Sequence, residues 1–323
     1  ITVWTSAEGA TVEVTNSEIV GAGDSYEAFV FPGEATVTGV DNVTYCVATI
    51  GDAGFDTIEE ALKEAKDGDT IVLQRDITSS EIITINKDIT FDGNGHTLTS
   101  TAGRAINVDG ADGATIQNLT IVANGERGIN IIGGATNVTI TDVDVTAKNY
   151  AVNLAASAGG AVVTITDSTL TGLNAFNAAA ANAEVTIAGS EIYCNDNSAN
   201  ESYGAISLNQ DAAGTKVVVT DSQFYIKGDS FVATNSASGK GATITIDGST
   251  EAVENMVAAI DCAGGYSKVF TSLADAFAEA DAGETVKLIA NATEDVTIAA
   301  TATLDLNGFA VAGTFTLTDT AAK

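Results

Sequence analysis

The chain of 323 residues carries 13 Lys and Arg against 43 Asp and Glu, a formal net charge of -30 at pH 7. Nucleic acids and anionic membrane surfaces are not expected partners, because binding to phosphate needs many Lys and Arg side chains. Membrane insertion is not expected either, since no segment reaches the ~18 consecutive apolar residues of a membrane span. The charge is typical of a secreted or cell-surface protein. The start at Ile1, without Met or a signal peptide, indicates a processed chain or an excised piece.

The first 50 residues contain part of a long repeat. The segment TVEVTNSEIVGAGDSY at 11–26 matches KVVVTDSQFYIKGDSF at 216–231, an offset of 205 residues. We therefore expect residues 1–50 to be the last part of a repeat unit whose other copy lies further along the chain.

Residues 57–67 have the pattern of a short amphipathic helix. Thr57 and Glu60 form a capping box, and apolar residues recur at i, i+3, i+4 and i+7 from Ile58. Gly68 ends the helix, and DTIVL at 69–73 begins a strand. A helix with one apolar face, placed before the first strands, is expected to cover the open apolar end of a β structure.

Two series of short strands follow, up to about residue 250. Segments such as TITDVDV at 139–145 recur at intervals of 22 to 32 residues, and segments such as RGINI at 127–131 lie between them. Both series alternate apolar and polar residues, the period of a strand with one buried face. Two strands per repeat, separated by Gly, Asn and Asp turns, predict a parallel β-solenoid whose rungs each add a strand to several sheets.

Stacked rungs place equivalent residues in columns. The second series predicts an inward apolar column and an outward polar column whose side-chain amides can bond from rung to rung. The apolar column is Ile106, Ile129, Val152, Phe176 and Ile206, and the polar column is Asn107, Asn130, Asn153, Asn177 and Ser207.

The first series predicts an outward threonine column, which Val218 interrupts. Its members are Thr115, Thr139, Thr164, Thr186 and Thr245. Regular threonine arrays are a feature of ice-binding solenoids, but the unequal rung lengths argue against a match to a flat lattice. Threonine is also common on exposed strands.

The capping segment occurs a second time near the end of the chain. FTSLADAFAEADAGETVKL at 270–288 repeats FDTIEEALKEAKDGDTIVL at 55–73, so a second short helix is expected at 272–282. ATLDLNGFAV at 302–311 matches ITFDGNGHTL at 89–98, and Cys262 is aligned with Cys46. We expect three parts with a repeat period of about 205–216 residues. They are 1–50, the terminal rungs of a preceding unit, 51–262, a complete unit, and 263–323, the first rungs of a following unit.

The capping helix with DGDTIVL, the segment FDGNGHTL and the rungs together resemble the right-handed parallel β-helix proteins of the pectate-lyase-like superfamily. The sequence looks most like their non-enzymatic relatives in repetitive surface proteins. The resemblance implies an all-β fold, a right-handed parallel β-helix with short amphipathic capping helices at about 57–67 and 272–282. It leaves function open, because the superfamily includes lyases, hydrolases, epimerases, adhesins and structural fibres.

Enzymes of this fold that cleave uronic-acid polymers carry either Asp clusters that hold Ca²⁺ with an Arg or Lys base, or Asp pairs with a His. The only histidine, His96, corresponds to Phe309 in the copy, which indicates a packing position. Asp142 and Asp167 fall in one column of rungs ~4.8 Å apart, where two carboxylates can share Ca²⁺. A turn role is the alternative. We expect no enzymatic activity and no cofactor other than this Ca²⁺.

Arg104 and Arg127 are 23 residues apart and so fall on adjacent rungs, with Tyr150 one rung further. Two stacked guanidinium groups repel each other unless an anion or carboxylates lie between them. One expectation is ion pairing with Glu126 and Asp109. The other is binding of an acidic glycan, because Arg binds carboxylates through two hydrogen bonds and an aromatic ring stacks on sugars.

Five Asn-x-Ser/Thr sequons are candidates for glycosylation. They start at Asn42, Asn118, Asn137, Asn200 and Asn291. The cysteines Cys46, Cys194 and Cys262 do not make a disulfide framework, and an odd number leaves at least one thiol free or paired between molecules.

These features predict an extracellular structural or adhesive protein, an element of a stalk, a fibre or a surface layer. Because the chain is out of phase with its repeat, its terminal rungs are expected to accept further rungs. These would come from a second copy, head to tail, or from a covalent tandem neighbour. An adhesin that binds cell-surface glycans is the alternative, and a lyase or hydrolase of acidic polysaccharides is a more distant one.

Overall fold

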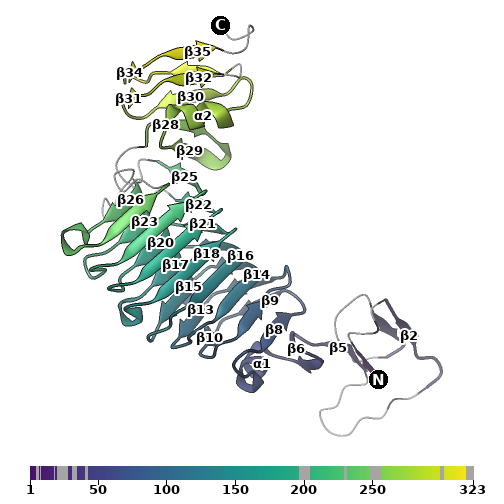
Figure 1. The fold of residues 1–323 in the computed structure, drawn as a ribbon. Coiled ribbons are helices and arrows are strands. Elements are labelled where there is room, and N and C mark those ends of the chain that lie inside the picture. The colour runs from purple at the N-terminus through teal and green to yellow at the C-terminus, as the bar shows by residue number, and fades with distance from the viewer. Residues whose placement is uncertain are drawn as a thin grey trace.

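The structure is a computed structural model of the chain. It describes residues 1–4, 7, 9–17, 19, 28–30, 35–40, 43–195, 204–228, 231–247, 256–298 and 302–317. The strands stack into a β-solenoid of about nine turns with mostly parallel sheets (Figure 1), which confirms the expected fold class. The two expected capping helices are α1 (Ile58–Glu64) and α2 (Leu273–Glu279). No helix in the described part of the chain is long and apolar enough to cross a membrane.

A sheet of seven parallel strands forms one side of the solenoid. The strands are β10 (Ile83–Ile85), β13 (Arg104–Asp109), β15 (Arg127–Ile132), β17 (Tyr150–Leu154), β20 (Asn174–Ala178), β23 (Gly204–Leu208) and β26 (Phe231–Asn235). The predicted apolar column from Ile106 to Ile206 is in register across five of these strands, and all its members are fully buried.

A second sheet of 19 strands supplies the other sides of the rungs. It also includes the two β-hairpins that precede the two capping helices. Its strands are β6 (Ala48–Ile50), β7 (Ala53–Phe55), β8 (Thr70–Leu73), β9 (Ile77–Ser79), β11 (Thr90–Asp92), β12 (Thr97–Ser100), β14 (Thr115–Ala123), β16 (Val138–Ala147), β18 (Val162–Thr166), β19 (Thr169–Gly172), β21 (Glu184–Ala188), β22 (Glu191–Cys194), β24 (Lys216–Thr220), β25 (Gln223–Lys227), β27 (Thr243–Ile246), β28 (Ala258–Asp261), β29 (Tyr266–Phe270), β30 (Thr285–Leu288) and β33 (Thr303–Asp305).

Smaller elements complete the described chain. The N-terminal strands are β1 (Thr2–Val3), β2 (Thr11–Glu13), β3 (Ala28–Val30), β4 (Thr36–Thr38) and β5 (Val43–Tyr45). The C-terminal strands are β31 (Ala292–Thr293), β32 (Val296–Ile298), β34 (Val311–Ala312) and β35 (Phe315–Leu317). Three 3₁₀ turns are η2 (Ala156–Ala158), η3 (Ser238–Lys240) and η4 (Ala263–Gly265).

The polar column is in the predicted register, but most of it is buried and not exposed to solvent as an outward column would be. The Nδ2 of Asn130 donates to Asn107 (3.0 Å), that of Asn153 to Asn130 (2.7 Å) and that of Asn177 to Asn153 (2.7 Å). Asn130, Asn153 and Asn177 are only 2%, 3% and 6% exposed. Alanines two residues earlier on β13, β17 and β20 are buried as well, so this part of the strand face does not meet solvent. A buried amide is tolerated here because its neighbours replace water as hydrogen-bond partners.

A bend divides the second sheet's two strands within a rung. The bend residue has a positive φ, between 47° and 53° in five rungs, and is Asn or Asp in each of them. The five residues are Asn118, Asp142, Asp167, Asp221 and Asp247. Asn and Asp tolerate this left-handed conformation better than other non-glycine residues. Asp142 and Asp167 therefore have a turn role.

A column of serines follows this bend, and the sequence analysis missed it. The hydroxyl of Ser168 donates to the carbonyl of Thr166 (2.7 Å) and accepts from the N–H of Val143 on the preceding rung (3.2 Å). Ser190 repeats both contacts, with Ala188 (2.9 Å) and with the N–H of Ser168 (3.2 Å). The side chains thus satisfy backbone groups that the bend removes from the strand ladder.

The threonine column has the predicted register, and it also includes Thr70 and Thr90. Val218 interrupts it, as predicted. The unequal rung lengths do not disturb this column, because equivalent residues pair directly on every rung from Thr70 to Thr245.

The N-terminal strands repeat the pairing of strands 205 residues later. Thr2 of β1 pairs with Phe29 of β3, as Ser207 of β23 pairs with Thr234 of β26. Thr11 of β2 pairs with Thr36 of β4, and the equivalent Lys216 pairs with Thr243. The long sequence repeat is thus also a repeat of local strand pairing.

Two hairpins, β6–β7 before α1 and β28–β29 before α2, correct the alignment of the cysteines. The N–H of Val47 donates to Phe55, and the N–H of Val257 donates to Phe270, so Val47 and Val257 are equivalent. Cys46 is then equivalent to Met256. Cys262 lies in the turn of the hairpin β28–β29, which is five residues longer than the hairpin β6–β7. The predicted match of Cys46 to Cys262 was therefore wrong.

The longer hairpin joins the rungs that precede it to the rungs that follow it. β29 pairs antiparallel with β25, and β28 pairs antiparallel with both β29 and β30. Ala259 and Val269 pack into the large core, whereas Ile260 and Phe270 pack into the core around α2. In the first hairpin, Thr49 and Gly54 occupy the positions of Ala259 and Val269. We call β25, β28 and β29 the joint (Figure 1).

Candidate functional site

Arg104, Arg127 and Tyr150 are neighbours in the structure. They are the first residues of β13, β15 and β17, and the register pairs Arg104 with Arg127 and Arg127 with Tyr150. All three are half-buried. Arg104, Arg127 and Tyr150 therefore form a polar column across the starts of three neighbouring strands of the seven-stranded sheet. We call it the arginine column.

Arg127 connects the arginine column to the asparagine ladder. Its Cζ lies 5.1 Å from the centre of the Tyr150 ring, a cation–π distance. Its Nη1 donates to Oδ1 of Asn130 at 3.3 Å, so Asn130 accepts from both Arg127 and Asn153. The Nε of Arg127 is buried and has no hydrogen-bond partner among the described residues. These contacts fix the plane of the guanidinium.

The expected ion pairs of the two arginines are absent. In the described chain no carboxylate oxygen lies within 4.0 Å of Arg104 or Arg127, so Glu126 and Asp109 do not neutralise them. Glu126 is an exposed bend residue that precedes β15. Asp109 is at the opposite end of β13 from Arg104. Two adjacent cations without carboxylates can bind an anionic group with two or more oxygens.

The column continues to Asn174, which pairs with Tyr150. Asn174 is fully buried, and its Nδ2 donates to the carbonyl of Gly204 (2.8 Å) and to Oγ of Ser207 (2.7 Å). Its Oδ1 has no hydrogen-bond partner within the described ranges. The sequence analysis did not single out Asn174, although its place in NAFNA, equivalent to Tyr150 in YAVNL, was a usable signal.

The candidate Ca²⁺ ligands Asp142 and Asp167 are exposed bend residues on neighbouring rungs. The described chain contains no group of three or more His, Cys, Asp and Glu side chains placed to hold a metal ion. His96 is partly exposed, with Nδ1 3.4 Å from Asp76. The shared Ca²⁺ stays a prediction.

The sequons lie in different surroundings. Asn137 is exposed, and its Nδ2 donates to Asp112 at 2.6 Å. Asn118 is a half-buried bend residue. Asn291 is exposed, and its Oδ1 accepts from the N–H of Ala310. Asn42 and Asn200 lie outside the described residues.

The cysteines differ in burial. Cys46 and Cys194 are buried and Cys262 is half-buried, and the thiols of Cys46 and Cys262 are free. The Sγ of Cys194 donates to the carbonyl of Leu173 at 3.2 Å. Burial and the nearby negative charge of Asp56 raise the pKa of the Cys46 thiol from 9.0 to about 11.

We expect Cys46 to react slowly with iodoacetamide in the native protein. With a pKa of about 11 instead of 9.0, its thiolate fraction at about pH 8 is ~100-fold below that of an ordinary thiol. Its rate should keep rising tenfold per pH unit towards pH 11, because the thiolate is the reacting form. Peptide mass spectrometry over time gives the rates of Cys46 and of the half-buried Cys262. Equal rates for the two cysteines would contradict this expectation.

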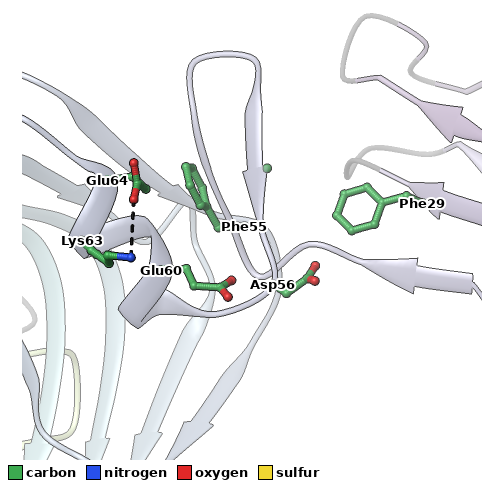
Figure 2. A pocket seen from close by; sticks show the side chains of 7 residues that line it. Phe29, Phe55, Asp56, Glu60, Lys63 and Glu64 are labelled. Atoms are coloured by element: carbon green, nitrogen blue, oxygen red, sulfur yellow. Dashed lines mark ion pairs between the residues drawn. The ribbon is translucent and has the colours of Figure 1, made fainter. Parts of the chain in front are cut away.

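Two hollows lie away from the arginine column. One lies beside α1 (Figure 2) and is lined by Phe29, Gly54, Phe55, Asp56, Glu60, Lys63 and Glu64. The rim of this hollow is mainly acidic, because it carries Asp56, Glu60 and Glu64. Its lysine, Lys63, lies 3.9 Å from Glu64. The other lies at the ends of β20 and β23 and is lined by Asn177, Ser207, Leu208, Asn209, Gln210, Asp211 and Ser236. Neither hollow contains a residue of the arginine column.

Comparisons with models of protein families, with curated proteins and with solved structures each found no match.

Proposed function

We propose that the chain is a structural or adhesive element of an extracellular β-helix protein, such as a stalk, a fibre or a surface layer. The pectate-lyase-like superfamily, in its non-enzymatic form, is the proposed origin of the fold. The joint is the observation that carries the proposal. It passes strand pairing from β25 through β29 and β28 to β30, and so from one helix-capped stack to the next.

A stack of this kind suits a mechanical role. Parallel pairing continues from rung to rung, and the buried asparagine and serine columns add side-chain bonds between rungs. Each rung contacts only its neighbours, so length can increase by adding units without a change of fold. The net charge of -30 favours repulsion between neighbouring stacks and keeps them apart laterally.

The C-terminal rung can accept a further rung. Phe315 and Leu317 of β35 pair in register with Val296 and Ile298, and they are 41% and 54% exposed. The equivalent pairs in the complete unit are Ile83 with Ile106 and Ile85 with Val108, and all four of these residues are buried. In the proposal, the covering rung comes from a second copy, head to tail, or from a covalent tandem neighbour.

We expect the chain to self-associate in a concentration-dependent way through this rung. Light scattering under reducing conditions, with electron microscopy of the heaviest fraction, should show species above the monomer mass of 32.6 kDa. Leu317→Asp should abolish them, because a charge would replace the exposed apolar side chain. Thr316→Asp, on the same strand but pointing the other way, is the matched control and should still associate. A wild-type monomer at all concentrations would contradict head-to-tail assembly.

A glycan-binding adhesin is the second candidate function, and the two adjacent arginines without carboxylate partners among the described residues favour it. We expect the chain to bind, on a glycan array, to glycans that carry carboxylate or sulfate groups. Arg104→Ala and Arg127→Ala should each weaken retention by tenfold or more, since each removes a charge-assisted contact. Lys63→Ala removes an exposed cation elsewhere and should have no effect. Turnover of an acidic polysaccharide that depends on these arginines would support the lyase or hydrolase instead.

A further inference from the structure

Two tyrosines next to the joint form a closely stacked pair. Tyr193 of β22 pairs in register with Tyr225 of β25, one rung further. Their ring centroids are 4.3 Å apart and their planes differ by 5°. Both side chains are half-buried, so part of each side chain is exposed at the surface of the protein.

One carboxylate serves both phenols. The hydroxyl of Tyr193 donates to Oε2 of Glu191 at 3.1 Å, and the hydroxyl of Tyr225 donates to Oε1 at 3.5 Å. Burial, followed by the hydrogen bond and charge of Glu191, raises the pKa of Tyr193 well above its usual range. Burial and the Glu191 charge also raise the pKa of Tyr225. Both phenols are therefore protonated, and loss of an electron from either requires a base that takes its proton.

A third tyrosine nearby provides a contrast. Tyr266 of β29 meets Tyr193 edge to face, with ring centroids 5.2 Å apart and an interplanar angle of 83°. Its hydroxyl donates to Oδ1 of Asn195 at 2.6 Å, not to Glu191. Lys227 lies 4.9 Å from the centre of its ring. Tyr266 thus shares the surroundings of the pair but lacks both the parallel stacking and the carboxylate.

We propose that Tyr193 and Tyr225 are an oxidative cross-linking site at which a dityrosine bond joins two rungs. The oxidant is hydrogen peroxide used by a haem peroxidase. Each phenol loses one electron to the peroxidase and one proton to Glu191, which passes it to water. The two radicals form a carbon–carbon bond between ring carbons ortho to the hydroxyls, and the hydrogens on those carbons move to the phenolic oxygens. The pair loses two hydrogen atoms in total, and one hydrogen peroxide becomes two waters.

The position of this bond gives it a mechanical purpose. It joins β22 to β25, and β25 is the strand on which the joint is built. A covalent bond there closes a loop of about 32 residues and restricts the unfolded chain in the way a disulfide does. The last rungs of the unit then cannot separate when the joint is pulled. This site does not depend on which of the two proposed functions is correct.

The test uses the full chain at low concentration with a haem peroxidase and hydrogen peroxide. We expect a monomeric product that has lost two hydrogens, shows dityrosine fluorescence, and yields a cross-linked peptide pair containing Tyr193 and Tyr225. Its thermal midpoint should rise by about 5 °C or more. Tyr193→Phe and Tyr225→Phe should each lose the product, and both keep the stacked ring, so both should fold. Glu191→Gln should slow its formation about tenfold, because the amide does not accept the proton.

Tyr266→Phe is the matched control and should form the product at the wild-type rate. A cross-link that maps to Tyr266, or only to tyrosines of different molecules, would overturn the proposal. Loss of the product in Tyr266→Phe, or its persistence in Tyr225→Phe, would do the same.

Discussion

Replacing Asn153 with Ala is expected to lower the free energy of unfolding by about 3 kcal/mol, because two buried hydrogen bonds disappear together. The change leaves Oδ1 of Asn130 without the donor from Asn153, and Nδ2 of Asn177 without its acceptor. Both of these neighbours are nearly fully buried, so water does not readily replace the lost partner. Urea unfolding measures the total effect. Amide hydrogen exchange in β17 shows whether the affected rung opens locally, as expected for a stack with nearest-neighbour contacts.

Asn107→Ala is the matched control for this change. Asn107 is at the end of the ladder, is half-buried, and accepts one hydrogen bond from Asn130. Loss of this hydrogen bond should lower the free energy of unfolding by about 1 kcal/mol. Equal effects of the two substitutions would mean that burial of the ladder does not contribute to its stability.

Replacing Val269 with Asp is expected to separate the joint. Val269 pairs with Phe224 of β25 and is buried in the large core, so the substitution places a carboxylate among apolar side chains. The free energy of unfolding should fall by about 3 kcal/mol or more. The destabilisation should be confined to the contact between β25 and β29. Limited proteolysis in the turn of the hairpin β28–β29 should accelerate, while the rungs from β10 to β23 stay protected.

Thr297→Asp provides the control for the joint. Thr297 is exposed on β32, so the same carboxylate remains in water there and should change stability by about 0.5 kcal/mol or less. If Val269→Asp left proteolysis of the hairpin unchanged, the joint would not depend on this packing.

The sequence predicted the register of the stack because a constant spacing of equivalent residues defines a rung. Ile129, Val152 and Phe176 pair as expected for this reason. Burial of the asparagines was missed, since alternation alone places Asn153 opposite the buried Val152 and therefore outward. The structure shows that both are buried. Alternation reports the face of a strand, but it does not report whether neighbouring segments cover that face.

Contacts that depend on loop length or on strand direction were not predictable. Cys46 and Cys262 were matched by residue type, but five extra residues in the second hairpin move Cys262 into the turn. Those residues also let β29 reach β25 and pair antiparallel with it, which no parallel repeat pattern indicates. Glu126 was expected to neutralise Arg127 because the two residues are adjacent in sequence, yet Glu126 lies in the bend before β15 and its carboxylate is more than 4.0 Å from the guanidinium.

Single-molecule stretching of the chain, held near Phe55 and near Leu317, tests the central claim that the joint makes two units one continuous stack. We predict that the wild-type chain extends first by unravelling of rungs, with no earlier step from separation of the joint. Val269→Asp should add that early step, and Thr297→Asp should not. An early, low-force separation in the wild-type chain would contradict the account, because it would show two units connected by a flexible link.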